Sequence, residues 1–494
     1  MDTRVDMSIF REYDIRGIYS ENLTQEVVRG IGFLLGERLK ASGGDKIAIG
    51  YDARVHSPTL YEWLKEGFIS SGVEVYFMGM IPTPVAYFAT FASEQIISQN
   101  LTSSIMITGS HNPPQYNGFK ITIDRKPFYG EDIKSLGQEL ASKINSKQGL
   151  ASTDSTKAKN VEHSSDLEAK ELNALQKYKD FLVEHFAKLK NFPYEVVFDY
   201  GNGVGALGLQ NVLNRLNIKH KSLYETPDGT FPNHHPDPSE EKNLADITKY
   251  MKEYKTPIGI AFDGDADRIA LMTQNHLYKG DEMAILFARE IAKSNPNPTI
   301  IGEVKCSSLM YDEINALGKA IMYKTGHSNL KVKLKELNAQ MAAEMSGHLF
   351  FNDRYFGYDD ALYAALRALE LFLDSTPSEI ESSIEALPKM YSTDEEKIST
   401  TEEEKFIKIE NLKNRLEAIA RDSRDITIHT ESHRKFPRIC EIISIDGVRV
   451  VFENGWGLVR ASNTTPVLVT RFEAKSREEL EQYQNAIFSV LKEC

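Results

Sequence analysis

With 494 residues, the chain is too long for a single hydrophobic core, so we expect three or four domains. Hydrophobic residues at 41% and charged residues at 26% indicate a folded globular protein and exclude a disordered or fibrous one. The formal net charge of -13 argues against general binding to nucleic acid or to a membrane surface.

The first part of the chain alternates short apolar runs with amphipathic stretches, which predicts an α/β fold. Strands are expected within residues 46–54, 73–84 and 103–114, each ending in a turn, with a helix over 57–71. Residues 141–168 are polar and have almost no apolar periodicity. We interpret this stretch as a surface excursion or linker that closes the first domain.

Two further α/β units follow. The second is expected to have a strand, a Gly-rich turn and a helix start over 194–209, and two strands around an acidic loop over 258–272. The third shows apolar runs and a helical pattern at 299–308, 319–327, 342–351 and 359–375. In three places an apolar strand is followed by a turn that contains an aspartate: Asp52, Asp199 and Asp263. This weak repeat is consistent with three related α/β units.

The composition changes again near the C-terminus, where the charged stretch 394–406 begins a last unit with the strands VRVVFE, GWGLVRAS and RFEA. No apolar run approaches the ~18 residues of a membrane span, and the N-terminus lacks the basic flank and apolar block of a secretory signal. Three widely spaced cysteines predict neither a disulfide framework nor a zinc cluster: Cys306, Cys440 and Cys494. We therefore expect a cytoplasmic protein.

The acidic loop DGDADR (263–268) places three carboxylates at alternate positions, separated by the two smallest residues. Carboxylates this close repel one another, and a hard divalent cation relieves that repulsion if the backbone curls so that their oxygens converge. An EF-hand is excluded because Arg268 and Gln274 stand where that motif needs Gly and Glu, and because strands flank the loop. A solvated acidic turn is the structural alternative. Three ligands leave positions open for water and a phosphate oxygen, which favours magnesium over calcium.

Ser110 lies in the turn TGSHNPP (108–114), directly after an apolar strand. The small residue before it, and the Asn-Pro-Pro sequence that interrupts regular structure after it, predict an exposed hydroxyl at the end of a strand. Reactive groups collect at strand ends in α/β folds. An ordinary turn or cap explains the same residues. A serine hydrolase is not favoured, because the G-x-S-x-G pattern is absent and His111 is poorly placed to act as the base for Ser110. No G-x-x-x-x-G-K-[ST] occurs, which excludes a P-loop.

The serine turn and the acidic loop together favour phosphoryl transfer. A phosphorylated serine gains about two negative charges near neutral pH and would complete a magnesium site built from three aspartates. The metal would neutralise charge on a phosphoryl group in transfer, which is most of what such catalysis requires.

Four motifs resemble, in order, the signature loops of the α-D-phosphohexomutases: TGSHNPPQYNGFK (108–120), DGDADR (263–268), EMSGH (344–348) and RASNTTP (460–466). The resemblance covers nearly the whole chain. It implies an α/β protein of four domains around a central cleft, three of related mixed α/β topology and a distinct α+β C-terminal domain. The implied domains are 1–160 with the phosphoserine loop, 170–276 with the metal-binding loop, 277–388 with the sugar-binding loop and 389–494 with the phosphate-binding loop.

The resemblance also implies a role for each motif. Ser110 would carry the phosphoryl group and would bind one Mg²⁺ together with Asp263, Asp265 and Asp267. Arg268 would orient or neutralise the phosphoserine, while Glu344 and Ser346 would bind sugar hydroxyls. The non-reacting phosphate would be held by Arg460, Ser462, Asn463 and Thr464, and these residue types can surround a phosphate with directional donors. An ordinary polar turn is the alternative explanation of this last loop.

Further residues match positions that line the cleft in the family: Tyr13, Arg16, His111, Lys120, Lys305 and His327. Lys120 and His348 are candidates for proton transfer to and from the sugar hydroxyl, although a structural histidine explains His348 equally well. These residues supply the local cations that an anionic substrate needs in a chain of net negative charge. One departure from the family pattern is Ala343, which stands where Gly is usual before the Glu.

The implied reaction interconverts hexose 1-phosphate and hexose 6-phosphate through a hexose 1,6-bisphosphate, which also acts as activator and must turn over so that either end can face Ser110. EMSGH resembles the phosphomannomutase/phosphoglucomutase branch, which favours mannose and glucose phosphates. The alternatives are a phosphoglucosamine mutase, a bisphosphate-forming relative, or a non-catalytic sugar-phosphate binding protein, which would be expected to have lost Ser110 or an aspartate. We expect a monomer or homodimer whose partner is a small hexose phosphate, with no nucleic acid and no membrane.

Overall fold

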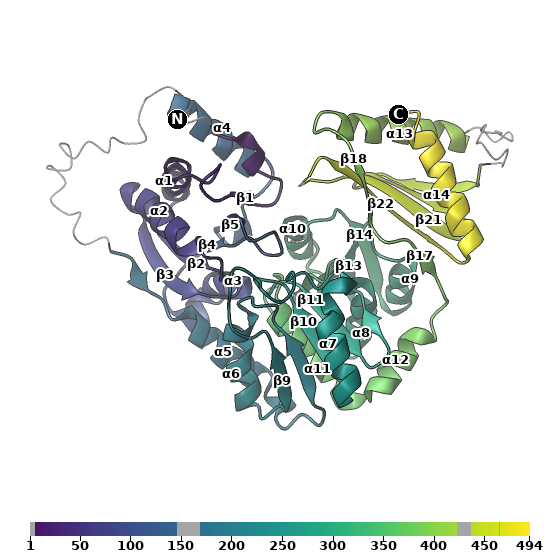
Figure 1. Cartoon of the computed structure of the whole chain (residues 1–494), viewed down its shortest axis with the longest axis horizontal. Helices are drawn as coiled ribbons and strands as arrows, with labels where there is room; N and C mark the ends of the chain where they lie inside the picture. The colour runs from purple at the N-terminus through teal and green to yellow at the C-terminus, as the bar shows by residue number, and fades with distance from the viewer. Residues whose placement is uncertain (1–4, 146–167, 422–435, 464) are drawn as a thin grey trace.

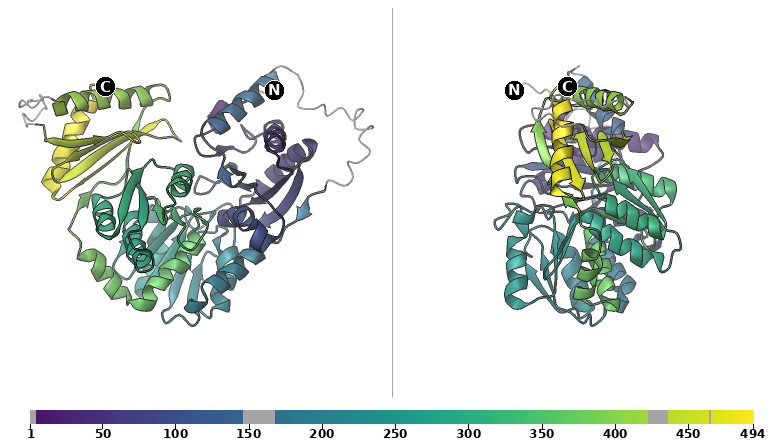
Figure 2. Two further views of the ribbon diagram at one scale, coloured as in Figure 1. Left: turned by 180° about the vertical axis from the view of Figure 1, so that it is seen from behind. Right: turned by 90° about the vertical axis from the view of Figure 1, so that its right-hand side faces the viewer.

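The computed structural model describes residues 5–145, 168–421, 436–463 and 465–494 (Figure 1). Four separate β-sheets divide this part of the chain into four domains. Figure 2 shows that the domains form an arc, with the first and last domains at its two ends and the middle two between them. The predicted α/β architecture is confirmed. None of the helices in the described residues is long and apolar enough to cross a membrane.

The first sheet follows the order β1-β5-β4-β2-β3-β7, with β6 beside β5. Strands β4, β2, β3 and β7 run parallel to one another, β5 pairs antiparallel with β4, and the edge strand β1 pairs antiparallel with β5. Side chains alternate between the two faces, so Ile47 and Ile49 pack with α1 and α2 while Ala48 packs with α3. The elements are η1 (Met7–Ile9), β1 (Ile15–Ile18), α1 (Gln25–Ala41), β2 (Lys46–Tyr51), α2 (Ser57–Ser70), β3 (Glu74–Met80), α3 (Thr83–Phe91), the π-helical turn η2 (Ser93–Ile97), β4 (Ser104–Ile107), β5 (Tyr116–Ile123), β6 (Lys126–Pro127), α4 (Glu131–Asn145) and β7 (Lys170–Glu171).

The second and third sheets repeat the central part of this pattern. Their orders are β12-β11-β10-β8-β9 and β14-β13-β15-β16. The second domain contains α5 (Ala174–His185), η5 (Ala187–Leu189), β8 (Val196–Asp199), α6 (Gly205–Arg215), β9 (His220–Leu223), η6 (Glu241–Leu244), α7 (Ala245–Tyr254), β10 (Ile258–Phe262), β11 (Ile269–Thr273) and β12 (Leu277–Tyr278). The third contains α8 (Gly280–Ala292), β13 (Thr299–Glu303), α9 (Ser308–Leu317), β14 (Lys319–Tyr323), α10 (His327–Leu337), β15 (Met341–Ala343), β16 (Leu349–Phe351), α11 (Ala361–Asp374) and α12 (Pro377–Glu385).

The fourth domain is different, because its sheet is antiparallel throughout, in the order β17-β22-β21-β20-β19 with β18 also on β22. Two helices, α13 and α14, pack on this sheet (Figure 1). The elements are β17 (Tyr391–Ser392), β18 (Glu396–Ser399), α13 (Glu404–Arg421), β19 (Ile439–Ile443), β20 (Val448–Phe452), β21 (Gly455–Ala461), β22 (Val467–Ala474) and α14 (Arg477–Leu491).

In each of the first three sheets, one hairpin joins the last parallel strand to an antiparallel neighbour. These hairpins are β4–β5, β10–β11 and β15–β16, and they contain the serine turn, the acidic loop and the EMSGH loop respectively. Three of the four predicted loops therefore occupy the same topological position in three related sheets. The fourth loop follows β21 in the antiparallel domain.

The repeat of aspartates at strand ends, predicted from the sequence, is only partly equivalent in the three sheets. Asp52 directly follows the strand β2, Asp199 ends β8, and the equivalent residue of the third sheet is Glu303, which ends β13. Asp263 instead follows the hairpin strand β10, because the acidic loop belongs to the hairpin rather than to the central strand.

The predicted linker 141–168 is also partly wrong. Helix α4 continues to Asn145, and residues 146–167 lie outside the described residues. After them, β7 pairs with β3 of the first sheet. The predicted domain ranges stay a prediction.

Asp360 connects two of the domains. Its Oδ1 accepts the N–H of Tyr363 at 2.8 Å and so caps the start of α11. It also accepts the hydroxyls of Tyr355 at 2.7 Å and of Tyr178, on α5, at 2.9 Å. Complete burial raises the pKa of Asp360 to about 6, and these hydrogen bonds offset only part of that effect.

This pKa predicts how stability changes with pH. The pKa in the folded state exceeds that of an unfolded Asp, so the folded protein holds the proton more tightly. Stability due to Asp360 is therefore greatest below about pH 4, falls as the pH rises towards 6, and is constant above. We expect the free energy of unfolding of the wild type, minus that of Asp360→Asn, to fall by about 2 kcal/mol between pH 4 and pH 7, measured by denaturant unfolding. The exposed Asp374→Asn serves as control. A difference independent of pH would contradict the prediction.

Candidate active site

The serine turn brings Ser110 to the acidic loop of the second domain. Ser110 Oγ donates to Asp263 Oδ2 at 2.7 Å and lies 3.0 Å from His111 Nδ1. The backbone of Ser110 has a φ of 47°, which is uncommon for a residue with a side chain and is typical of strained functional positions.

Two expectations about this turn are wrong. Ser110 is 3% exposed, because the loop of the second domain covers the hydroxyl that was predicted to be open. His111 was expected to be poorly placed, but the left-handed backbone at Ser110 turns its ring towards Oγ. Burial and the nearby charge of Arg268 hold the pKa of His111 well below its usual value, so its imidazole is neutral.

The acidic loop curls as predicted. Asp263 Oδ1 accepts the N–H groups of Asp267 at 3.0 Å and Arg268 at 3.1 Å, and Ala266 adopts a positive φ of 60°. Oxygens of Asp263, Asp265 and Asp267 lie within 4.8 Å of one another, and all three residues are fully buried. The strands β10 and β11 flank the loop, as the rejection of an EF-hand requires.

These three carboxylates fit a hard divalent cation. Burial and the charges of Asp267 and Asp265 raise the pKa of Asp263 well above its usual range, and a cation at the cluster would oppose that rise. Asp265 Oδ1 is buried and has no hydrogen-bond partner among the described residues. A buried carboxylate oxygen without a donor is costly, and coordination to a cation would satisfy it.

Lys120 lies against the aspartates from the first domain. It follows the serine turn on β5, and its Nζ contacts Asp265 Oδ2 at 3.0 Å and also Asp267. Burial opposes the charge of the ammonium group, but the carboxylates outweigh burial and raise the pKa of Lys120. Its charge in turn helps to lower the pKa of Asp265 and Asp267, although burial acts in the opposite direction.

The EMSGH loop brings His348 and Glu344 to the same place. His348 Nε2 lies 3.1 Å from Asp267 Oδ1 and its Nδ1 lies 2.9 Å from Glu344 Oε2. Burial would lower the pKa of His348, but the two carboxylates raise it to about 9. Arg268 Nε lies 3.0 Å from His348 Nε2, and Glu344 Oε1 accepts the N–H of Gly326 at 2.6 Å. Ser346 is half-buried in the same turn.

Tyr13 joins three domains. Its hydroxyl donates to the carbonyl of Thr325 at 2.8 Å and accepts a hydrogen bond from Asn463. Thr325 N donates in turn to Asp446 Oδ2 at 3.1 Å, and Arg460 Nε donates to the same oxygen at 3.0 Å. The first, third and fourth domains therefore meet at the loop that follows β21. Thr464 lies outside the described residues.

The remaining predicted residues are each held by protein groups. Arg16 Nη1 donates to the carbonyl of Thr108 at 3.0 Å. Lys305 Nζ lies 2.8 Å from Glu395 and 3.5 Å from Glu303. His327 Nδ1 lies 3.6 Å from Asp359 Oδ2, and burial together with the charge of Lys331 holds the pKa of His327 well below its usual value. Ser462 Oγ lies 3.0 Å from Thr465 Oγ1.

Several residues behind the loops were missed. Lys405 Nζ, on α13, donates to the carbonyl of Ser462 at 2.7 Å. Glu303 Oε1 accepts the N–H of Met345, in the EMSGH loop, at 2.9 Å. Asp52 and Arg54 hold the serine turn in a similar way. The two carboxylates could have been found from the sequence, because each ends or directly follows an apolar strand, as Asp52 does in the run KIAIGYDAR.

The serine turn and the acidic loop also touch through their backbones. A Cβ added to Gly264 would lie 2.7 Å from the carbonyl oxygen of Ser110, and one added to Gly203 would lie 2.5 Å from the carbonyl oxygen of Gly264. A side chain at Gly264 would push the serine turn of the first domain away, whereas one at Gly203 would displace the acidic loop within the second domain. Glycine is therefore required at this junction.

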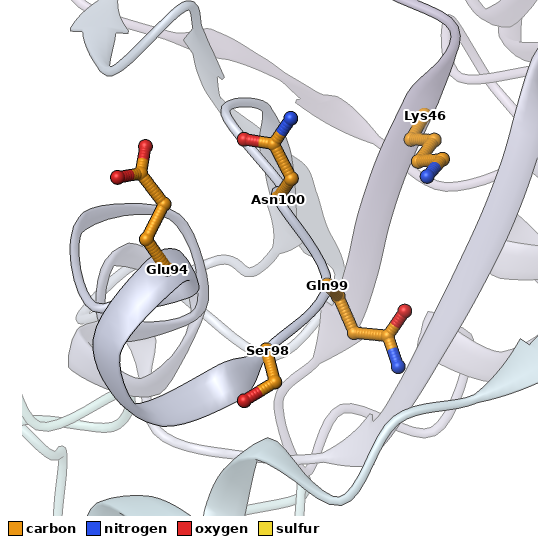
Figure 3. A pocket seen from close by; sticks show the side chains of 5 residues that line it. All are labelled: Lys46, Glu94, Ser98, Gln99 and Asn100. Carbon is orange, nitrogen blue, oxygen red and sulfur yellow. The ribbon is translucent and has the colours of Figure 1, made fainter.

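A shallow pocket elsewhere on the first domain is lined by Lys46, Glu94, Ser98, Gln99 and Asn100 (Figure 3). Lys46 begins β2, whereas Asp52 and the predicted site lie past its other end. The labelled side chains in Figure 3 point in different directions and do not converge. This pocket therefore contains none of the predicted site residues, and we assign it no function.

The aspartate cluster predicts a response to divalent cations. Magnesium at 100 times its Kd should raise the free energy of unfolding by about 2.7 kcal/mol, because only the folded protein holds the three carboxylates together. We expect a matching rise in Tm with magnesium chloride, its reversal by a chelator, and its loss in Asp265→Asn. The control is Asp180→Asn, an exposed aspartate paired with Arg215 in the second domain. An unchanged magnesium response in Asp265→Asn would rule out the cluster as the metal site.

Comparison with known protein families agrees with this arrangement. The four domain models of the phosphoglucomutase/phosphomannomutase family match the chain in order. Alpha/beta/alpha domain I matches residues 7–148, domain II matches 176–277, domain III matches 279–391 and the C-terminal domain matches 396–490. Together they cover most of the chain.

Full-length relatives are similarly named. The chain is 38% identical over 487 residues to a phosphomannomutase/phosphoglucomutase of Pseudomonas aeruginosa, with 98% of this chain and 96% of that protein covered. It is 39% identical over 487 residues to a phosphoglucomutase of Neisseria meningitidis, with the same coverage. A crystal structure of a phosphoglucomutase/phosphomannomutase family protein from Burkholderia thailandensis superposes with a TM-score of 0.82 at 34% identity, covering 99% of this chain and 98% of that one. The chain belongs to the phosphoglucomutase/phosphomannomutase family.

Proposed function

We propose that this protein is a phosphohexomutase that interconverts hexose 1-phosphate and hexose 6-phosphate, with Ser110 as the carrier of the phosphoryl group. The observation that supports this most directly is the 2.7 Å contact between Ser110 Oγ and Asp263 at the aspartate cluster. A phosphoryl group on Oγ would add negative charge beside three buried carboxylates. A cation between the phosphoserine and the carboxylates would relieve the repulsion between their negative charges.

Asp263, Asp265 and Asp267 would hold one Mg²⁺, and an oxygen of the phosphoserine would be a further ligand. When bound, the metal would neutralise charge on the transferring phosphoryl group. Arg268, whose Nη1 lies 3.9 Å from Asp237, would orient the phosphoserine. This proposal rests on the orphaned Asp265 oxygen and on the donor set of three carboxylates.

Proton transfer needs groups next to the reacting oxygens. The attacking sugar hydroxyl loses a proton, and Ser110 Oγ regains one when the phosphoryl group leaves. We propose that Lys120 and His348 handle these protons, since both contact the acidic loop and burial keeps them from bulk water. The neutral His111 would hydrogen-bond the serine oxygen and the substrate.

The far end of the substrate would be bound by the residues that meet around Tyr13. Arg460, Ser462, Asn463 and Thr464 would hold the non-reacting phosphate, with help from Tyr13, Arg16, Lys305 and His327. Glu344 and Ser346 would bind the sugar hydroxyls. A hexose 1,6-bisphosphate formed on the enzyme would turn over so that either phosphate faces Ser110, and added bisphosphate would act as activator.

Mannose and glucose phosphates are the substrates we propose, because the relatives at 38% and 39% identity are a phosphomannomutase/phosphoglucomutase and a phosphoglucomutase. The three cysteines are free thiols, which fits the cytoplasm as the proposed compartment.

Replacing Ser110 tests the mechanism. Ser110→Ala removes the atom that accepts the phosphoryl group, so we expect mutase activity to fall by about 10³-fold or more. Intact mass should show one phosphate on the wild type after incubation with a hexose 1,6-bisphosphate and none on the variant. Ser135→Ala, on the exposed face of α4, is the matched control. Full activity in Ser110→Ala would overturn the proposed mechanism.

A substrate panel tests the choice of sugar. We expect kcat/KM for mannose 1-phosphate and glucose 1-phosphate to exceed that for glucosamine 1-phosphate by about tenfold or more, a difference of about 1.4 kcal/mol in transition-state binding. Conversion to the 6-phosphates is measured with coupled assays under saturating magnesium. A preference for glucosamine 1-phosphate would favour the phosphoglucosamine mutase alternative instead.

A further inference from the structure

Arg54 lies behind the serine turn and is almost completely buried, at 1% exposure. Its guanidinium donates to four backbone carbonyls of the turn and the following segment. Nη2 donates to the carbonyls of Ser110 at 2.8 Å and Asn112 at 2.6 Å, and Nη1 donates to those of Pro113 at 2.7 Å and Tyr116 at 2.9 Å. One side chain therefore ties together the whole segment that contains Ser110.

Asp52 holds the opposite side of the same turn. Its Oδ2 accepts the Thr108 hydroxyl at 2.8 Å and the N–H of Gly109 at 3.0 Å, and lies 3.3 Å from Arg54 Nε. Its Oδ1 accepts the N–H of Arg54 at 3.0 Å. Asp52 thus satisfies donors of the turn while Arg54 satisfies its acceptors, and the pair is anchored at the end of the central strand β2.

The fit between Arg54 and the turn leaves no free space. A Cβ added to Gly109 would lie 2.1 Å from Arg54 Nε and 2.2 Å from its Cζ. The second domain closes over the other side, where the ring of Phe231 lies 5.2 Å from the guanidinium carbon and Gly229 contacts the backbone of Arg54. Arg54 is therefore packed between the serine turn and the domain that contains the aspartates.

We propose that Arg54 is a positioning residue for phosphoryl transfer, which sets the left-handed backbone of Ser110 and thereby the reach of Oγ to the aspartate cluster. The inference rests on the proposed function of Ser110. A planar guanidinium with five donors can bind four carbonyls at once, whereas an ammonium group has three donors around one atom. Misplacement of a reacting atom by about 1 Å can cost about 10²-fold in rate, so the turn must be held precisely.

The experiment compares Arg54→Met and Arg54→Lys with the wild type. Among the described residues, no hydrogen bond or ion pair joins Arg54 to those proposed to bind the sugar or the distal phosphate. We therefore expect kcat to fall by about 10²-fold in Arg54→Met with KM changed by less than about threefold. Arg54→Lys should restore part of the lost kcat. Magnesium binding, measured by calorimetry, should be retained in both variants because the three aspartates are untouched. Arg38→Met, a partly exposed arginine of the same domain that pairs with Glu139, is the control.

A second variant tests the same contacts in case Arg54→Met does not fold. Gly109→Ala keeps every charge but places a methyl group against the guanidinium, so it should lower kcat in the same way with little change in KM. The effects of Gly109→Ala and Arg54→Lys should be non-additive in the double variant, since both act on the same contacts.

Two results would overturn the inference. A folded Arg54→Met that binds magnesium and keeps kcat within about threefold of wild type would show that the turn holds its shape without the guanidinium. An equal loss of magnesium binding and of kcat would show a general structural role instead. Ser110→Ala separates these results from a failure of the proposed function: if that variant is active, the mechanism itself fails, and if it is inactive, the Arg54 result stands by itself.

Discussion

The repulsion among three buried carboxylates is the constraint on which the rest of the site depends. Asp263, Asp265 and Asp267 are held within 4.8 Å of one another with no exposure to water, and such a cluster is stable only if positive charge surrounds it. The first domain supplies Lys120, the acidic loop supplies Arg268, and the third domain supplies His348. Three domains therefore meet at one point, around the carboxylates that we propose hold the cation for phosphoryl transfer.

The sequence was sufficient to predict the acidic loop, because its residues are consecutive or nearly so. Three aspartates separated by single small residues predicted a cluster of carboxylates, and the pattern of apolar runs predicted the strands on either side. The sequence could not predict the contact between His111 and Ser110, since it depends on one positive φ. It also could not identify Arg54 or Lys405, because both bind distant backbone carbonyls. Those bound by Arg54 lie 56 to 62 residues further along the chain, and the one bound by Lys405 lies 57 residues further along. Carbonyls carry no residue-type signal.

A common device appears behind the loops of the first three domains. The central strand of each sheet ends in a buried carboxylate, namely Asp52, Asp199 and Glu303, and each of them accepts hydrogen bonds from a loop. Asp52 holds the serine turn and Glu303 holds the EMSGH loop, whereas Asp199 contacts His234 in the segment that covers Arg54 from the second domain. A rigid sheet therefore determines where each loop lies, and the loop residues are free to differ in chemistry.

The junction of Gly264 with the carbonyl of Ser110 has a mechanical consequence. Two backbones in contact form a hard stop: neither can yield by changing a rotamer, as a pair of long side chains would. At this junction the first two domains therefore meet at a separation that side-chain rotation does not change. The two ends of the arc meet instead through the side chains of Tyr13 and Asn463, which can rotate apart.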